Sequence, residues 1–183
     1  MTRIFDFLFS FFGLLILSPI ILLLLIIGLF DTGSPLFRQE RLCLNQRPFY
    51  LLKFRSMHVN TKAVATHLVQ VSAITKWGSF LRKSKLDELP QLFNVLKGDM
   101  SFVGPRPNLF NQTELIEERS KRGVYAIRPG ITGLAQINKI DMSTPQLLAE
   151  TDAQMIQSFS IVKYFYYIVV TVLGKGSGDR VVR

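Results

Sequence analysis

The chain carries two adjacent carboxylates, Asp87 and Glu88, a short distance before a proline-flanked arginine, Arg106. A carboxylate can attack a phosphorus centre and form an acyl phosphate. A second carboxylate beside it could hold Mg²⁺, which binds carboxylate and phosphate oxygens together. Arginine makes two-pronged contacts with phosphate oxygens, and flanking prolines restrict where its side chain points. These residue types therefore suit chemistry at a phosphate group.

Further basic and acidic residues are candidates for the same site. Three further basic residues could hold phosphate. Arg128 stands in a proline- and glycine-containing turn, Arg82 lies shortly before the carboxylate pair, and Lys53 begins the segment KFRSM. Asp99 and Asp152 are additional oxygen ligands to consider for a metal ion. The plain alternative for any single basic residue is a solvated surface charge. Their occurrence in several turn motifs favours the functional interpretation.

A short helix is expected to position the carboxylate pair. Apolar residues recur at helical spacing after the pair, and the pattern ends at Gly98. Pro90 suits the first turn, so Asp87 is expected at the N-cap, where exposed amides and the helix dipole favour an ionised carboxylate. The plain alternative is that Asp87 only caps the helix and Glu88 is a solvated acid in the first turn.

The N-terminal region predicts a membrane helix. Residues 7–30 contain no charged residue, and about 20 apolar residues suffice to cross a bilayer as a helix. A cleaved signal peptide is disfavoured, because Asp6 closely follows Arg3 and no small-residue cleavage site appears. Proline removes a backbone hydrogen bond, so Ser18 and Pro19 predict a kink in the middle of the run. A kinked span and a re-entrant hairpin both remain open at this point.

Charge and cysteine usage restrict the partners and the compartment. The 183 residues carry a net charge of +9; residues 1–31 carry −1, so the remainder carries +10. This balance indicates anionic partners, which are nucleic acid, anionic lipid or a phosphorylated substrate, and the apolar segment favours the last two. Arginines soon after the apolar segment place the following domain on the cytoplasmic side. The only cysteine, Cys43, excludes an intrachain disulfide and fits a reducing compartment.

The remaining segments predict an α+β domain that is mainly helical. Residues 36–42 and 47–57 read as two strands joined through Asn45 and Gln46 into a small hairpin. Residues 112–123 read as a charged helix. Residues 144–157 read as another, with Thr144 as its N-cap.

The turn over residues 128–138 is rich in glycine and proline, and we expect it to bring the backbone close to a neighbour. The aromatic, apolar stretch 158–174 is expected to lie at a membrane surface, with an ordinary buried helix as the alternative.

Three sequence blocks carry a family resemblance. They are KFRSM at 53–57, LRKSKLDELPQLFNVLKGDMSFVGPRP at 81–107 and RPGITGLAQIN at 128–138. Together with the Ser-Pro pair in the apolar segment, they closely resemble the bacterial monotopic phosphoglycosyl transferases, the family of small bacterial sugar transferases. The resemblance extends from about residue 2 to residue 173, with a long and nearly gapless central block.

This resemblance implies an enzyme that transfers a phospho-sugar from a UDP-sugar to polyprenyl phosphate, usually undecaprenyl phosphate, and releases UMP. It implies that Asp87 forms a covalent phospho-sugar intermediate and that Glu88 binds Mg²⁺. It also implies phosphate and substrate binding by Lys53, Arg82, Arg106 and Arg128. The reaction would be the first membrane step of glycoconjugate synthesis, so downstream glycosyltransferases are expected partners and nucleic acid is not.

The resemblance further implies a monotopic membrane protein. Its N-terminal helix, residues 1–31, would be re-entrant and broken at Ser18 and Pro19, so that both helix ends lie in the cytoplasm. Residues 32–183 would form the catalytic part of one integrated domain at the cytoplasmic face of the bacterial inner membrane. Amphipathic helices would lie along the lipid surface. With no further N-terminal bundle or nucleoside-sensing domain, the chain looks like the minimal catalytic form.

The chain departs from the family pattern near its C-terminus. The family commonly has an Asp, a Tyr three residues later, a Ser, and a second Asp twelve residues after the first. Asp152, Ser160 and Thr171 fit this pattern, whereas Met155 replaces the Tyr and Tyr164 replaces the second Asp. Residues 137–145 also differ from the common glycine- and arginine-containing form. These departures indicate a subfamily with a different sugar preference.

Two other hypotheses remain. A basic, membrane-anchored binding module would explain the charge and the apolar segment without catalysis. It would not explain the carboxylate pair, and the chain lacks the interleaved aromatic platform expected for single-stranded nucleic acid. An inactive member of the family is the second hypothesis, although both acids are present.

Overall fold

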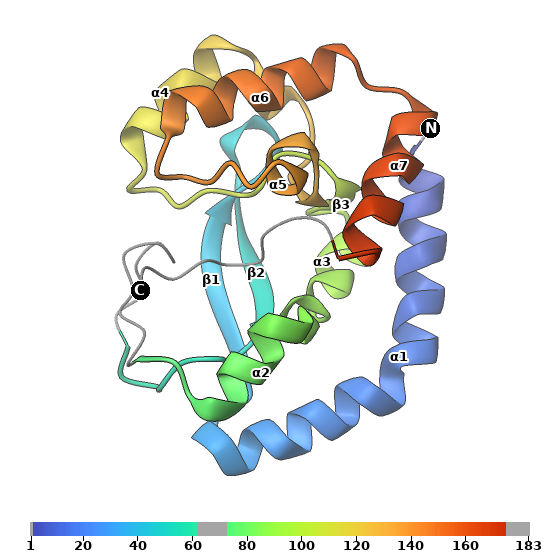
Figure 1. The fold of residues 1–183 in the computed structure, drawn as a ribbon, viewed down its shortest axis with the longest axis vertical. Coiled ribbons are helices and arrows are strands. Elements are labelled where there is room, and N and C mark those ends of the chain that lie inside the picture. The colour runs from blue at the N-terminus through green and yellow to red at the C-terminus, as the bar shows by residue number, and fades with distance from the viewer. Residues whose placement is uncertain (1, 62–72, 175–183) are drawn as a thin grey trace.

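The computed structural model describes residues 2–61 and 73–174. Its elements alternate short strands with helices, and the predicted mainly helical α+β class is confirmed (Figure 1). In chain order they are α1 (Thr2–Thr32), β1 (Leu36–Leu42), η1 (Leu44–Gln46), β2 (Pro48–Phe54), α2 (Lys76–Ser84), η4 (Leu86–Glu88), α3 (Gln91–Lys97), β3 (Ser101–Val103), α4 (Thr113–Lys121), η5 (Val124–Ala126), β4 (Gly130–Thr132), α5 (Leu134–Ile137), α6 (Pro145–Gln157) and α7 (Ile161–Val172).

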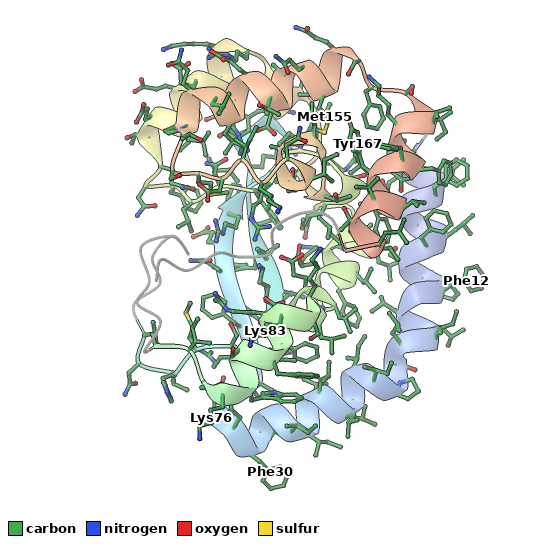
Figure 2. The ribbon with its side chains drawn as sticks, viewed as in Figure 1. Phe12, Phe30, Lys76, Lys83, Met155 and Tyr167 are labelled. Carbon is green, nitrogen blue, oxygen red and sulfur yellow. The ribbon has the colours of Figure 1, made fainter. Side chains whose placement is uncertain are left out.

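Helix α1 is long, apolar and bent. It has 31 residues and is long and apolar enough to cross a membrane, and few residues of its apolar stretch are buried. The ribbon bends between the arm that carries Phe12 and the arm that ends near Phe30 (Figure 2). This stretch contains Pro19, and the Ser18 hydroxyl donates back to the carbonyl of Leu15 at 2.8 Å. The predicted kink is therefore confirmed; how the helix sits in a bilayer stays a prediction.

The predicted hairpin is confirmed. Strands β1 and β2 pair antiparallel in the register Leu36 to Phe54, and the turn residues Asn45 and Gln46 both have left-handed backbone angles, with φ of 54° and 57°. Alternate residues of a strand share a face. Phe49, Leu51 and Lys53 are consequently all on the buried face of β2. A basic side chain thus continues the core-facing row of the strand.

The turn that carries the two carboxylates differs from the prediction. Lys85 adopts a left-handed conformation (φ 58°) that ends α2, and Asp87 falls in the separate 3₁₀ turn η4. Pro90 is the N-cap of α3, which ends as expected at Gly98 with φ 101°. The N-cap role predicted for Asp87 is therefore wrong, because the left-handed residue starts a tight turn before the helix begins.

Strands β3 and β4 form a parallel pair that joins distant parts of the chain. Ser101 is in register with Gly130, and Val103 with Thr132. A Cβ on Gly130 would lie 2.0 Å from the amide nitrogen of Gly104, so the two backbones touch. This confirms that the turn over residues 128–138 brings the backbone close to a neighbour.

The C-terminal helices pack on two different parts of the protein: α6 lies beside α4, and α7 runs beside the first arm of α1 (Figure 1). Thr144 is the N-cap of α6 as predicted, although its side chain makes no capping hydrogen bond. In α7 the N-cap is Ser160, whose hydroxyl accepts from the amide of Lys163 at 3.2 Å. One face of α7 buries Tyr164 and Tyr167, whereas its other side chains leave an apolar surface exposed. The helix thus combines a buried face with a face suited to a lipid surface.

Helix α1 is fixed to the rest of the protein along both arms. Phe5 near its start packs edge-on against Phe165 of α7, with ring centroids 5.3 Å apart. Beyond the bend, Leu24 forms a buried cluster with Phe54 and Leu81. The apolar helix and the following domain therefore share one packed interior.

Candidate active site

Two distant segments of the chain converge on Glu88. Its Oε1 accepts from Lys53 Nζ of β2 at 3.2 Å and lies 3.5 Å from Arg106 Nη2 of the loop after β3. The Glu88 side chain is 14% exposed, and the Lys53 side chain is 10% exposed. Charges in such a partly dry setting interact more strongly than on the surface. Three of the residues predicted from sequence are thereby brought together.

Asp87 lies beside Glu88 in η4 and is 4% exposed. The apolar residues on either side of the pair, Leu86 and Leu89, pack into the cluster that contains Leu24 of α1. The turn that carries the carboxylates therefore packs into the same cluster as the second arm of the apolar helix.

Arg82 lies on α2, which leads into this turn. Its Nε donates to the Ser56 hydroxyl at 2.8 Å. Its Nη1 is buried and has no hydrogen-bond partner in the described part of the chain. A Cβ on Gly78 would lie 2.0 Å from the carbonyl oxygen of Ser56, so α2 rests on the backbone there. A buried guanidinium donor with no partner suits an anionic ligand.

Arg128 and Asp99 lie at the opposite end of α3. Arg128 Nε donates to the carbonyl of Gly98 at 2.8 Å, and Asp99 pairs with Lys97 at 3.1 Å. Arg128 also lines a cavity of about 420 Å³ together with Arg3 of α1. The structure does not place these two predicted site residues in the group around Glu88.

Asp152 is in a setting unlike that expected of a metal ligand. Its Oδ2 accepts from Nε and Nη2 of Arg119 at 3.1 and 2.7 Å, and both residues are 1% exposed. Burial raises the pKa of the Asp152 carboxyl, and the Arg119 guanidinium acts in the opposite direction. The carboxylate is thus committed to an ion pair between α4 and α6.

Asp87 and Glu88 provide the donor chemistry that Mg²⁺ prefers. Among residues 2–61 and 73–174, no group of three or more acidic, histidine or cysteine side chains could hold a metal ion by itself. Mg²⁺ is commonly held by one or two carboxylates, with substrate phosphates and water completing its shell. Glu88 lies next to Asp87 in η4, so two carboxylates are adjacent there. The carboxylate pair therefore fits a Mg²⁺ ion that arrives with a phosphorylated substrate.

The two departures from the family pattern lie in one buried cluster. Met155 and Tyr164 both pack there, each 0% exposed. The Tyr164 hydroxyl donates to Asp6 Oδ1 at 2.8 Å, and Met155 Sδ accepts from the amide of Leu134 at 3.3 Å. Both replacements therefore have structural partners in the core between α1, α6 and α7.

Sequence reasoning missed two polar residues that support the site. Asn94 of α3 joins the edge of β2, because its Nδ2 donates to the Tyr50 carbonyl at 2.8 Å and its Oδ1 accepts from the Leu52 amide at 3.0 Å. Arg119 is buried although it lies in a highly charged helix. The one signal for Arg119 is its position four residues after Leu115, on the apolar face of the helix.

The sequence is similar to known proteins over almost its full length. The family described as "Bacterial sugar transferase" matches residues 1–175. The chain is 38% identical to the uncharacterized sugar transferase EpsL of Bacillus subtilis, with 94% of the chain and 85% of the relative covered. It is 36% identical to the exopolysaccharide production protein PSS of Rhizobium leguminosarum, with 97% and 98% covered.

A third relative has a more specific name. The UDP-glucose:undecaprenyl-phosphate glucose-1-phosphate transferase of Escherichia coli is 40% identical over 81% of the chain. The chain spans about a third of the length of this and other curated relatives. The family match, over residues 1–175, includes the block that carries the carboxylate pair and its basic partners. The chain belongs to the bacterial sugar transferase family and is an enzyme of that family.

Proposed function

We propose that the protein transfers a sugar 1-phosphate from a UDP-sugar to undecaprenyl phosphate, as the first membrane step of a bacterial polysaccharide or glycoprotein glycan. The observation that carries this proposal is the convergence of Lys53 and Arg106 on Glu88, beside the buried Asp87. The names of several relatives support the same class of donor and acceptor.

The proposed reaction has two displacements at one phosphorus atom. A carboxylate oxygen of Asp87 attacks the β-phosphorus of the UDP-sugar, and the bond from this phosphorus to the bridging oxygen breaks to release UMP. A phosphate oxygen of the lipid then attacks the same phosphorus, and the Asp87 carboxylate leaves. The product is polyprenyl-diphosphate-sugar, and the enzyme returns to its initial state.

The burial of Asp87 suits a covalent intermediate. An acyl phosphate is prone to hydrolysis, and exclusion of water protects such an intermediate. Asp87 is 4% exposed, so few water molecules can reach its carboxylate. This favours transfer to the lipid phosphate over loss to water.

The basic residues would hold the phosphates in place for this reaction. Lys53 and Arg106 orient Glu88 and place two positive charges beside it, which favours phosphate oxygens there. Arg82 offers its buried Nη1. Mg²⁺ bound at Glu88 would neutralise charge on the diphosphate. Arg128, at the other end of α3, would contact only a part of a substrate remote from Asp87.

We also propose that α1 is re-entrant and that the protein lies at the cytoplasmic face of the inner membrane. The bend in α1, its many exposed apolar side chains and the exposed apolar face of α7 support this arrangement. Cysteines introduced by Thr2→Cys and Glu40→Cys, in a Cys43→Ser background, should react with a membrane-impermeant maleimide from the same side. Labelling from opposite sides would exclude the re-entrant arrangement.

A panel of UDP-sugars with undecaprenyl phosphate and Mg²⁺ tests the activity. At least one sugar should give UMP, and Asp87→Asn should abolish UMP release while leaving membrane association intact. Intact-mass analysis should detect a phospho-sugar adduct on the native protein and none on Asp87→Asn. Asp99→Asn, at the opposite end of α3, is the matched control and should retain turnover. No UMP from any sugar, with salt-sensitive binding to anionic vesicles, would instead favour a binding module.

A further inference from the structure

The loop that carries Arg106 is fixed along its whole backbone. Each of the five carbonyl oxygens from Gly104 to Asn108 accepts a hydrogen bond from another segment. In that order the donors are Gln136 Nε2 at 3.0 Å, Gly130 N at 2.9 Å, Arg119 Nη1 at 2.8 Å, Arg41 Nη1 at 3.2 Å and Leu42 N at 3.0 Å. The loop also contains Pro105 and Pro107, whose rings restrict the backbone further. The loop is therefore preorganised without regular secondary structure.

Arg119 holds the residue of this loop that reaches the carboxylate pair. One edge of its guanidinium, Nε and Nη2, is bound to Asp152 of α6. The remaining nitrogen, Nη1, donates both to the Arg106 carbonyl and to Asn108 Oδ1, at 2.8 and 2.9 Å. Asp152 thus fixes the plane of the guanidinium, and that plane sets the position of the Arg106 backbone.

Helix pairing alone does not account for this buried ion pair. A buried ion pair is generally no more stabilising than a well-packed apolar pair of similar size. Helices α4 and α6 are also joined at their surface by Arg122 and Glu150, whose side chains approach to 3.1 Å. Arg119 differs from Arg122 both in its burial and in its contact with the Arg106 loop.

We propose that Arg119 and Asp152 are positioning residues that hold Arg106 against Glu88. The inference rests on the proposed function, in which Arg106 and Glu88 act at the substrate phosphates. A lysine in place of Arg119 has one ammonium group and no planar fork, so it cannot fix the loop and bind Asp152 in the same geometry. The guanidinium of Arg106 would then be displaced from its position beside Glu88.

A double-mutant cycle on kcat/KM tests the coupling. Small displacements of positioning groups cost up to about 100-fold in rate, so Arg119→Lys should lower kcat/KM by about 10- to 100-fold. Arg122→Lys, on the same helix pair, should stay within about twofold, as expected for an exposed pair. In an Arg106→Ala background, Arg119→Lys should cost less than about threefold more, because it acts through the residue already removed. Additive losses, or an equal loss in Arg122→Lys, would overturn the proposal.

Hydrogen exchange provides a readout that needs no turnover. In membrane-embedded protein, Arg119→Lys should speed amide exchange in the segment 101–112 relative to the native protein, whereas Arg122→Lys should leave this segment unchanged. Unchanged exchange in Arg119→Lys would overturn the positioning role even if UMP is formed. If Arg119→Lys exchanges faster than the native protein but the native protein forms no UMP, the positioning contact is supported and the proposed function is refuted.

Discussion

The hydroxyl of Tyr164 joins helix α7 to helix α1, and its removal gives a quantitative test of the structure. It donates to Asp6 Oδ1 at 2.8 Å, and the residue is completely buried. Tyr164→Phe removes one oxygen atom and leaves the ring in place, so the loss is that of the hydrogen bond with only a small cavity.

The expected cost follows from the partners that remain. A hydrogen bond to a charged group contributes about 1.5–3 kcal/mol. Asp6 Oδ1 still accepts from Ser101 Oγ and from the amide of Phe102, at 2.9 and 3.0 Å. We therefore expect the lower part of that range, about 1.5–2 kcal/mol. For a protein of this length, this corresponds to a fall in Tm of about 3–8 °C.

Thermal unfolding of nanodisc-embedded protein would measure the change, with Tyr167→Phe as its control. Tyr167 lies on the same helix and in the same cluster, and its hydroxyl makes no hydrogen bond within residues 2–61 and 73–174. The control should shift Tm by about 1 °C or less, because Tyr167→Phe removes no hydrogen bond within the described residues and keeps the ring in the cluster. Equal shifts in both variants would refute the view that the Asp6 contact anchors α7 to α1.

The hydrogen bond of Tyr164 should keep its full stabilising effect from neutral pH to about pH 9. Burial and the Asp6 carboxylate both raise the pKa of Tyr164 above its usual value of 10.0. A group with a raised folded-state pKa contributes its stability fully below the unfolded pKa and loses it as pH rises through the folded value. The Tm difference between native protein and Tyr164→Phe should therefore be the same at neutral pH and at about pH 9.

Three further predictions concern the site and its frame. Gly130→Ala should destabilise the protein by about 1–3 kcal/mol, because its Cβ would lie 2.0 Å from the amide nitrogen of Gly104; chemical denaturation would measure this. Lys53→Met should lower kcat by about 100-fold, because Glu88 loses one of its two cations and the phosphates lose a donor; UMP release would measure this. Cys43 should react more slowly with a thiol reagent at pH 8 than the unfolded chain does, because burial raises the pKa of its thiol.

Matched controls separate these effects from general damage. Gly13→Ala should leave stability nearly unchanged, because its Cβ would meet only Leu92 Cδ1 at an ordinary 3.5 Å. Lys97→Met should retain turnover, because the Lys97 side chain is 73% exposed and pairs with Asp99. A stable Gly130→Ala protein, an active Lys53→Met enzyme or a rapidly modified Cys43 would each contradict the corresponding argument.

Local signals in the sequence predicted the elements that depend on local geometry. Asn45 and Gln46 tolerate the left-handed backbone that the hairpin requires, Gly98 ends α3, and Pro145 begins α6. The parallel pairing of β3 with β4 was not predictable in this way. It joins two three-residue strands that are far apart in the sequence, and no periodic pattern can develop over so short a length.

The site was predictable in residue type and less so in arrangement. Lys53, Glu88 and Arg106 were expected at one site, and they do converge. The N-cap interpretation of Asp87 failed because the left-handed residue Lys85 ends α2 and begins a separate 3₁₀ turn, and α3 starts only after Pro90. The burial of Arg119 depends on which face of α4 meets α6, and the charge pattern of that helix conceals it.

The packing of the carboxylate turn on α1 has a consequence for where the reaction takes place. Leu86 and Leu89 flank Asp87 and rest on the same cluster as Leu24, beyond the bend of α1. In the proposed membrane arrangement, the bilayer around this arm also sets the height of the Asp87 carboxylate relative to the lipid headgroups. A thicker or thinner bilayer would then move the proposed nucleophile relative to the phosphate of the acceptor. The rate of the reaction should thus respond to acyl-chain length in the surrounding lipid, although no acyl chain takes part in the chemistry.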